Sequence, residues 1–299
     1  MARSYFSQVV VKSEEPLGYV HKAKFEGNIG DSPIKINSRK LRDKEYSQKK
    51  PENVFRIVCL GDSVTLGWGV RLEDTFEKKM EGLLNSTASA SKFEVINAGV
   101  GGYNTVQIAS FFRSEVQQLE TDLVLLFFTV NDAGDRFEPF PAAKAESKDR
   151  ISNVSHVLIE ILKRILPTIS GIMEYLTHPK VDYQSDYLPP NDEGWRRSKE
   201  ALRSVKSLSR KNGSKLIVFM IPAMQNLKEN YSFGTIHTKL KQFCIEEKIP
   251  FFDLYDFFEG KNDSEVRISL IDGHPNEFAH DLIARSVKKQ LTEGGFLQN

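Results

Sequence analysis

The sequence is short of cysteine, with only Cys59 and Cys244 among 299 residues. Two thiols cannot build a disulfide framework or a four-cysteine metal site. Both lie in apolar segments, so we expect them to be buried and free. The zinc-binding spacings His-Glu-x-x-His and Cys-x-x-Cys are absent as well. The sequence therefore shows no recognisable metal-binding motif.

An excess of charge of either sign is also missing, because 41 Lys and Arg stand against 40 Asp and Glu, a net charge of +1. This balance does not favour nucleic acid as a partner. The opening residues, MARSYFSQVVVKSEEP, lack the apolar core of a secretory signal, and no uncharged apolar stretch is long enough to span a bilayer. Taken as given, the sequence predicts a cytoplasmic protein. A trimmed N-terminus would make the bacterial envelope or periplasm the alternative.

From residue 54 onward, short apolar runs alternate with helical patterns. The runs that read as strands are VFRIVCL, FEVINAG, DLVLLFFTV, KLIVFMIPA and IPFFDLYDFF. Strand and helix in alternation imply parallel pairing through right-handed crossovers. We predict a three-layer α/β/α sandwich around a central parallel five-stranded sheet.

Two segments depart from this alternation. Residues 1–52 hold short strand-like pieces between Gly and Pro turns, which predicts a strand-rich arm packed on a main domain of residues 53–299. Residues 133–190 form an insert with a very apolar helical stretch that breaks at Pro167. This insert is either a helical hairpin that caps the core or a lid beside a binding site.

Chemically useful residues follow the predicted strands. In open parallel sheets, ligands bind beyond the carboxyl ends of the strands. GDS follows the first strand, NAGVGGYN the second and VND the third, and IDGHPN precedes the last helix. These motifs supply a serine, a glycine-rich amide cluster, an asparagine and an Asp-His pair. Acyl transfer needs the same groups: a nucleophile, oxyanion donors, a base and a residue that orients the base.

Each motif alone has an ordinary explanation as a turn or a helix cap. The glycine-rich loop is no dinucleotide fingerprint, because it lacks the third glycine of G-x-G-x-x-G and follows the second strand. GDSVTLGWG is no phosphate loop, because no Gly-Lys-Ser/Thr follows it. Of the six histidines, His274 alone falls in a predicted loop at this sheet edge beside a carboxylate.

In this order, the motifs resemble those of the SGNH hydrolase superfamily, also called GDSL esterases and lipases. CLGDSVTLGWGV looks like the first block, VINAGVGGYNT the second, FFTVND the third and DGHPN the fifth. The likeness covers residues 54–292 in outline. It implies a flavodoxin-like fold and esterase activity without a cofactor. The segment PIKINSRKLRDKEY also looks like an N-terminal extension of some bacterial envelope-associated members.

The resemblance implies a role for five residues of this sequence. Ser63 would be the nucleophile, His274 the general base and Asp272 the residue that orients His274. The backbone amides of Ser63 and Gly102, with the side chain of Asn131, would form the oxyanion hole. A serine hydroxyl is too weakly acidic to attack unaided, so it needs a base within hydrogen-bonding reach.

The sequence departs from the family pattern in two places. Thr129 replaces the glycine that usually begins the third block, and Asp272 lies one residue closer to His274 than in the usual Asp-x-x-His. Positions i and i+2 of an extended segment point to the same side, so this pair can still form a hydrogen bond. We expect Asp62 and Asp132 to hold their loops through hydrogen bonds rather than to take part in the chemistry.

The implied function is a serine esterase that cleaves O-acetyl or longer acyl esters through an acyl-enzyme. One alternative is an O-acyltransferase acting on a glycan or another hydroxyl acceptor, and another is a non-catalytic ligand-binding module. Some family members, including polysaccharide O-acetylation enzymes, have the short Asp-x-His spacing, so this resemblance and the N-terminal arm favour O-acetyl groups on glycans as substrates. The apolar insert instead favours a small-molecule or lipid ester with a longer acyl chain, and would allow peripheral contact with a membrane.

Overall fold

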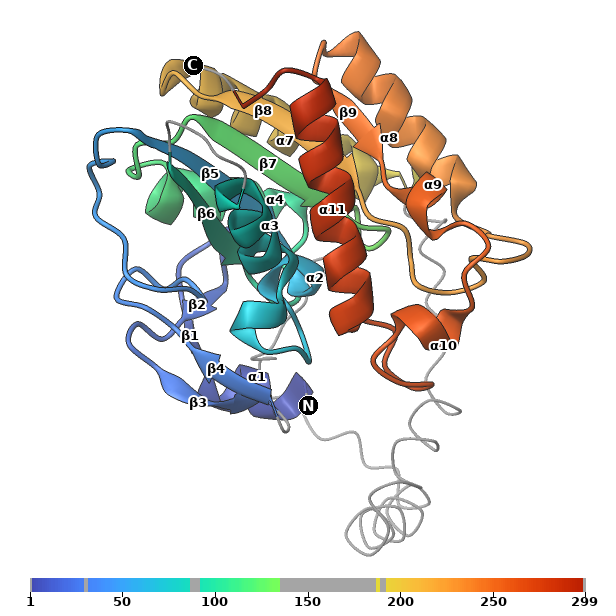
Figure 1. Ribbon diagram of the computed structural model, residues 1–299, viewed down its shortest axis with the longest axis horizontal. Helices are drawn as coiled ribbons and strands as arrows, with labels where there is room; N and C mark the ends of the chain where they lie inside the picture. The colour runs from blue at the N-terminus through green and yellow to red at the C-terminus, as the bar shows by residue number, and fades with distance from the viewer. Residues whose placement is uncertain (1, 30–31, 87–91, 135–186, 189–191, 298–299) are drawn as a thin grey trace, which may run out of the picture.

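A parallel five-stranded sheet forms the centre of the computed structural model, which describes residues 2–29, 32–86, 92–134, 187–188 and 192–297. The strands follow the order β6-β5-β7-β8-β9 (Figure 1). Their bounds are β5 (Val54–Gly61), β6 (Lys92–Gly99), β7 (Leu123–Phe128), β8 (Lys215–Met220) and β9 (Phe251–Asp253). All neighbours pair in parallel, which confirms the predicted fold class. Counted within the sheet the order is 2-1-3-4-5, as in flavodoxin-like folds.

Helices cover both faces of this sheet (Figure 1). On one face lie α3 (Phe76–Asn85) and α11 (Glu277–Glu293); the other carries α4 (Thr105–Phe111), α7 (Glu193–Lys211) and α8 (Gly234–Glu246). Successive β5 residues enter different apolar clusters: Ile57 packs with α3 and α11, and Val58 with α4 and α7. Both faces are buried, which explains why the strand reads as an unbroken apolar run.

The fifth predicted strand ends earlier than its apolar pattern. It stops at Asp253, whose side chain accepts a hydrogen bond from the Tyr255 amide and turns the chain into α9 (Tyr255–Phe258). Short apolar runs do not distinguish strand from helix, so the sequence could not locate this boundary. On the other side of the sheet, a π-helical turn, η2 (Phe112–Val116), directly follows α4.

The N-terminal arm contains two antiparallel hairpins and a helix that the sequence did not predict. These elements are α1 (Ala2–Gln8), β1 (Val10–Lys12), β2 (Tyr19–His21), β3 (Glu26–Ile29) and β4 (Ser32–Lys35). Tyr5, Val9, Tyr19 and Ile34 are buried in the same apolar cluster as α4 and α7. Burying one such side chain contributes roughly 1.5–3 kcal/mol, so the arm is firmly docked.

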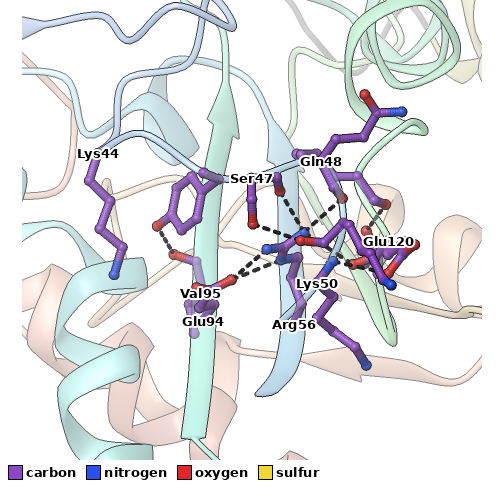
Figure 2. A network of polar contacts seen from close by, with 12 residues as sticks. Lys44, Ser47, Gln48, Lys50, Arg56, Glu94, Val95 and Glu120 are labelled. Atoms are coloured by element: carbon purple, nitrogen blue, oxygen red, sulfur yellow. Dashed lines mark hydrogen bonds and ion pairs between the residues drawn. The ribbon is translucent and has the colours of Figure 1, made fainter. Parts of the chain in front are cut away.

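A buried polar network ties the end of the arm to the sheet (Figure 2). The Arg56 side chain, near the start of β5, is 0% exposed. Its Nε donates to Glu94 Oε2 at 2.8 Å, and its Nη1 donates to the carbonyls of Ser47 and Gln48 at 3.1 and 3.2 Å. Removing one partner of a buried ion pair typically costs about 3–5 kcal/mol, so this network anchors the arm at the amino end of the sheet.

Other expectations concern single residues and the insert. Cys59 and Cys244 are buried and free, as predicted. Among the described residues, no helix has the length and apolar character needed to cross a membrane. The predicted insert falls almost entirely outside the described residues, and the division into an arm and a main domain stays a prediction.

Candidate active site

The three loops that follow β5, β6 and β7 meet the loop before α11 at the carboxyl edge of the sheet. A cavity of about 370 Å³ opens there. Its lining includes Ser63, Asn131 and His274, three of the residues implied by the sequence. The remaining lining residues are Asp62, Val64, Thr129, Val130, Pro222, Ala223, Met224, Gln225, Gly273 and Pro275.

Ser63, His274 and Asp272 form one hydrogen-bonded line. Ser63 Oγ lies 2.8 Å from His274 Nε2, and His274 Nδ1 lies 2.6 Å from Asp272 Oδ1. A carboxylate only accepts hydrogen bonds, so Nδ1 carries the proton and Nε2 is left to accept from the Ser63 hydroxyl. The shortened Asp-x-His spacing therefore still brings the carboxylate to the imidazole.

The carboxyl group of Asp272 is held in its ionised form. Burial alone would raise its pKa, but the hydrogen bond and charge of His274 outweigh burial, and the side chain of Trp68 adds a further hydrogen bond. The pKa of Asp272 is lowered as a result. An ionised carboxylate at this position favours the His274 tautomer that can take a proton from Ser63.

The turn that carries Ser63 is held by its neighbour Asp62. Ser63 begins the short helix α2 (Ser63–Leu66), and the Asp62 side chain caps it by accepting from the Val64 amide at 2.9 Å. Asp62 thus holds its loop through a hydrogen bond, as we expected from the sequence. Capping satisfies an amide that the first turn of a helix leaves without a backbone partner.

Thr129, the departure from the family pattern, lies at the centre of a polar cluster. Its Oγ1 is 3.1 Å from Asp62 Oδ2, 2.8 Å from Asn131 Oδ1 and 3.1 Å from Asp132 Oδ1. The hydroxyl has one proton, so it donates to one of these three oxygens at a time. Burial, and then the charge of Asp62, raise the pKa of Asp132 well above its usual value.

The glycine-rich loop after β6 is tied to the other two loops. The Val100 amide donates to the Gly61 carbonyl at 3.1 Å, and the Thr105 amide donates to the Asp132 carbonyl at 3.0 Å. Gly102 has φ +79°, a left-handed conformation that glycine adopts without strain. Of the five predicted site residues, Gly102 and Asp272 do not line the cavity; Asp272 reaches it through His274.

Sequence reasoning missed Trp68, whose indole ring stacks on the His274 ring. Trp68 belongs to the same motif as Ser63, but an aromatic residue in a turn gave no sign of which ring it would contact. His237 and His280 lie in helices α8 and α11. In the part of the chain that the structure describes, no group of three or more His, Cys, Asp or Glu side chains is arranged to hold a metal ion.

Comparisons with known proteins identify a family and similar folds. The family described as GDSL-like Lipase/Acylhydrolase matches residues 59–282. The acetylxylan esterase Axe2 of Geobacillus stearothermophilus is similar in structure, with a TM-score of 0.51 and 14% identity over 82% of this chain and 97% of that one. The protein TesA gives a TM-score of 0.50 and 14% identity over 80% of this chain and 98% of its own. No curated protein sequence matches the chain significantly.

Proposed function

The chain belongs to the GDSL-like lipase/acylhydrolase family, and we propose that this carboxylic ester hydrolase works through a triad of Ser63, His274 and Asp272. The observation that carries the proposal is the line of hydrogen bonds from Asp272 Oδ1 through both nitrogens of His274 to Ser63 Oγ, with distances of 2.6 and 2.8 Å. A hydroxyl, an imidazole and a carboxylate in this order form the arrangement that activates a serine nucleophile.

In the first half of the reaction, Ser63 Oγ attacks the carbonyl carbon of the ester while His274 Nε2 takes the hydroxyl proton. The electron pair of the carbonyl double bond moves to its oxygen, and the imidazolium that forms is stabilised by Asp272. When the pair returns, the bond to the alcohol breaks. His274 gives its proton to the departing alkoxide, and the acyl group stays on Ser63.

In the second half, water replaces the alcohol. His274 takes a proton from the water, whose oxygen attacks the acyl carbon. Collapse of the second tetrahedral intermediate breaks the bond to Ser63 Oγ, which regains its proton from His274, and the carboxylic acid leaves. Each half returns His274 to the neutral state.

We propose that the negative charge on the tetrahedral oxygen is met by the Ser63 amide, the Gly102 amide and the side chain of Asn131. One N–H of Asn131 Nδ2 points to Asp62 Oδ2 at 3.3 Å, which leaves the second to serve the oxyanion. Removing one donor of this kind typically slows catalysis about 10²–10³-fold.

The proposed substrates are short acyl esters, with O-acetyl groups on glycans as the first candidate. The cavity joins apolar wall residues such as Val64, Val130 and Met224 to the polar Gln225, which suits a small acyl group attached to a hydroxylated alcohol. The acetylxylan esterase named above shares the fold, and its substrate supports this choice as an analogy.

Two measurements test the proposal. Purified protein is assayed with p-nitrophenyl esters from acetate to dodecanoate and with acetylated xylo-oligosaccharides, beside a Ser63→Ala variant. We expect acetyl esters to be preferred, Ser63→Ala to be inactive yet folded, and a fluorophosphonate probe to label Ser63. An active Ser63→Ala variant would overturn the triad. Preference for long chains would overturn the substrate class, and acyl transfer to an added sugar that outruns hydrolysis would establish the acyltransferase alternative.

A further inference from the structure

Two tyrosines of the N-terminal arm hold both polar backbone groups of Gly101, the residue before Gly102. The Gly101 amide donates to Tyr5 Oη at 3.0 Å, and the Tyr19 hydroxyl donates to the Gly101 carbonyl at 2.8 Å. Both tyrosines are 0% exposed. The arm and the candidate oxyanion loop are therefore linked by buried hydrogen bonds between segments far apart in the sequence.

The hydrogen bond from Tyr19 fixes a direction that matters for catalysis. The carbonyl of Gly101 and the amide of Gly102 belong to one planar peptide unit, in which a trans bond points C=O and N–H in opposite directions. Holding the Gly101 oxygen therefore sets where the Gly102 N–H points. Two adjacent glycines resist rotation of this unit less than any other pair, so the loop needs an outside contact to keep one orientation.

The donor and the acceptor of each hydrogen bond around Tyr5 can also be assigned. His21 Nδ1 lies 2.9 Å from the carbonyl of Lys40, which can only accept, so Nδ1 carries the imidazole proton. His21 Nε2 then accepts from the Tyr5 hydroxyl at 2.6 Å, and Tyr5 Oη is left to accept from Gly101. Burial lowers the pKa of His21 to about 4, so the ring stays neutral and this order persists near pH 7.

Close packing supports the same link. A Cβ atom added at Gly101 would lie 3.0 Å from Tyr5 Cε1, so any other residue would push the ring away by a few tenths of an ångström. Tyr5 also meets Trp68 edge to face, with ring centroids 5.4 Å apart. From the same arm, Arg42 donates to the carbonyls of Leu66 and Val70 on either side of Trp68, at 2.9 and 2.6 Å.

We propose that the N-terminal arm completes the active site, with Tyr19 and Tyr5 as positioning residues that keep the Gly102 amide directed at the oxyanion. This inference rests on the proposed function of Ser63 and Gly102. It gives the arm a role in the chemistry that docking alone would not require.

Tyr19→Phe removes the hydroxyl and keeps the ring, so it frees the peptide without removing the Gly102 amide. Because full loss of an oxyanion donor costs about 10²–10³-fold, we expect kcat to fall about tenfold or more. The donor acts in the transition state, so KM should stay within about twofold of the wild-type value. A boronic acid that forms a tetrahedral adduct with Ser63 should bind more weakly by a factor similar to the loss in kcat.

The matched control is Tyr46→Phe, which removes the hydroxyl of another buried arm tyrosine. Tyr46 Oη contacts Lys78 and the Val95 carbonyl, away from Gly101. Its kcat and boronate affinity should match the wild type. Amide hydrogen exchange of residues 100–104 provides a readout independent of activity, and should become faster in Tyr19→Phe but not in Tyr46→Phe.

The outcomes separate the two proposals. If Ser63→Ala is as active as the wild type, the proposed function fails. If Ser63→Ala is inactive but Tyr19→Phe keeps the kcat, boronate affinity and exchange rates of Tyr46→Phe, the role of the arm is overturned and the esterase mechanism stands. Should Tyr19→Phe not fold, Tyr5→Phe replaces it, since it removes the other bond that holds Gly101: kcat should fall and exchange of residues 100–104 should become faster, and wild-type values of both would overturn the role of the arm.

Discussion

The indole ring of Trp68 stacks on the imidazole of His274, with ring centroids 5.5 Å apart and an interplanar angle of 27°. Trp68 and Ser63 lie in one motif, so the same turn carries the proposed nucleophile and the surface against which its base rests. Trp68 also helps to keep the pKa of Asp272 low through a side-chain hydrogen bond. Trp68 therefore supports both His274 and Asp272, in a chain where the spacing between these two residues is shortened.

Replacing Trp68 should therefore harm catalysis more than substrate binding. In Trp68→Leu, His274 loses the stacked ring and Asp272 loses a hydrogen bond. Misplacement of a catalytic group by about 1 Å can cost up to about a hundredfold, so we expect kcat to fall at least about tenfold with little change in KM. Trp68→Phe keeps a ring against His274, so its kcat should lie between those of the wild type and Trp68→Leu. Steady-state kinetics with p-nitrophenyl acetate decide the matter; a lower kcat/KM caused by KM alone would contradict this role.

The role of the Thr129 hydroxyl can be tested with valine, which has nearly the same shape as threonine but lacks the hydroxyl. Thr129→Val removes the group between Asp62, Asn131 and Asp132, and leaves the buried Asp132 Oδ1 without its hydroxyl partner, at a cost of roughly 1–3 kcal/mol. The Asn131 amide would lose its orientation, so kcat should fall about tenfold, while Thr129→Ser should stay near the wild type. Equal kcat values for the two variants would show that the hydroxyl does not position Asn131.

The fold could be predicted because short stretches of the sequence indicate each of its strands and helices. The apolar runs that became β5, β6, β7 and β8 are buried on both faces, and their alternation with helices fixes parallel pairing. Ser63, Asn131 and His274 could be placed together for the same reason, since each follows or precedes a recognisable element at one edge of the sheet.

The supporting contacts could not be predicted, because they join segments without periodic patterns. Trp68 meets His274 where the turn after β5 lies beside the loop before α11, and Tyr19 meets Gly101 where the arm packs on the loop after β6. The Thr129 substitution was visible in the sequence, but its bonds to two carboxyl groups depend on how the loops after β5 and β7 converge. Helix α1 was missed because a short segment with few apolar residues has a weak helical signal.

The buried His280 side chain should make the folded protein less stable in mild acid. Burial lowers its pKa to about 3 in the folded protein, whereas an unfolded chain titrates near 6.5. Protons therefore bind preferentially to the unfolded state as pH falls below 6.5, which destabilises the fold. Between pH 7 and pH 5 this linkage amounts to about 2 kcal/mol for one histidine.

His280→Asn removes this titration and can still accept from the Phe76 amide, which His280 Nδ1 does at 3.1 Å. Urea unfolding at pH 7 and pH 5 should show a smaller loss of unfolding free energy in the variant, by about 2 kcal/mol. His21, whose pKa is lowered to about 4, should keep part of the acid sensitivity in both proteins. An unchanged difference between the two pH values would mean that His280 is protonated in the fold.

Tyr231 and His237 form a tyrosine–histidine pair like that of Tyr5 and His21, and this pair supports the wall of the cavity. The Ala223 amide donates to Tyr231 Oη at 3.0 Å, Tyr231 Oη lies 2.9 Å from His237 Nε2, and His237 Nδ1 lies 2.8 Å from Asp253 Oδ2. Ala223 lines the cavity beside Met224 and Gln225. None of these three residues is a proposed oxyanion donor. These residues would contact a substrate equally before and during reaction, so the pair should affect binding rather than the chemical step.

Tyr231→Phe should therefore raise KM and leave kcat nearly unchanged, the opposite of the pattern expected for Tyr19→Phe. One net hydrogen bond is worth roughly 0.5–1.5 kcal/mol, which corresponds to about a two- to tenfold rise in KM. The rise should be larger for esters of bulky alcohols or longer acyl groups, because they press on the wall that Ala223 supports. Tyr46→Phe again serves as the control for removing a buried phenol. A fall in kcat at constant KM would place Tyr231 with the residues that act on the transition state, since a wall that only binds substrate cannot produce that pattern.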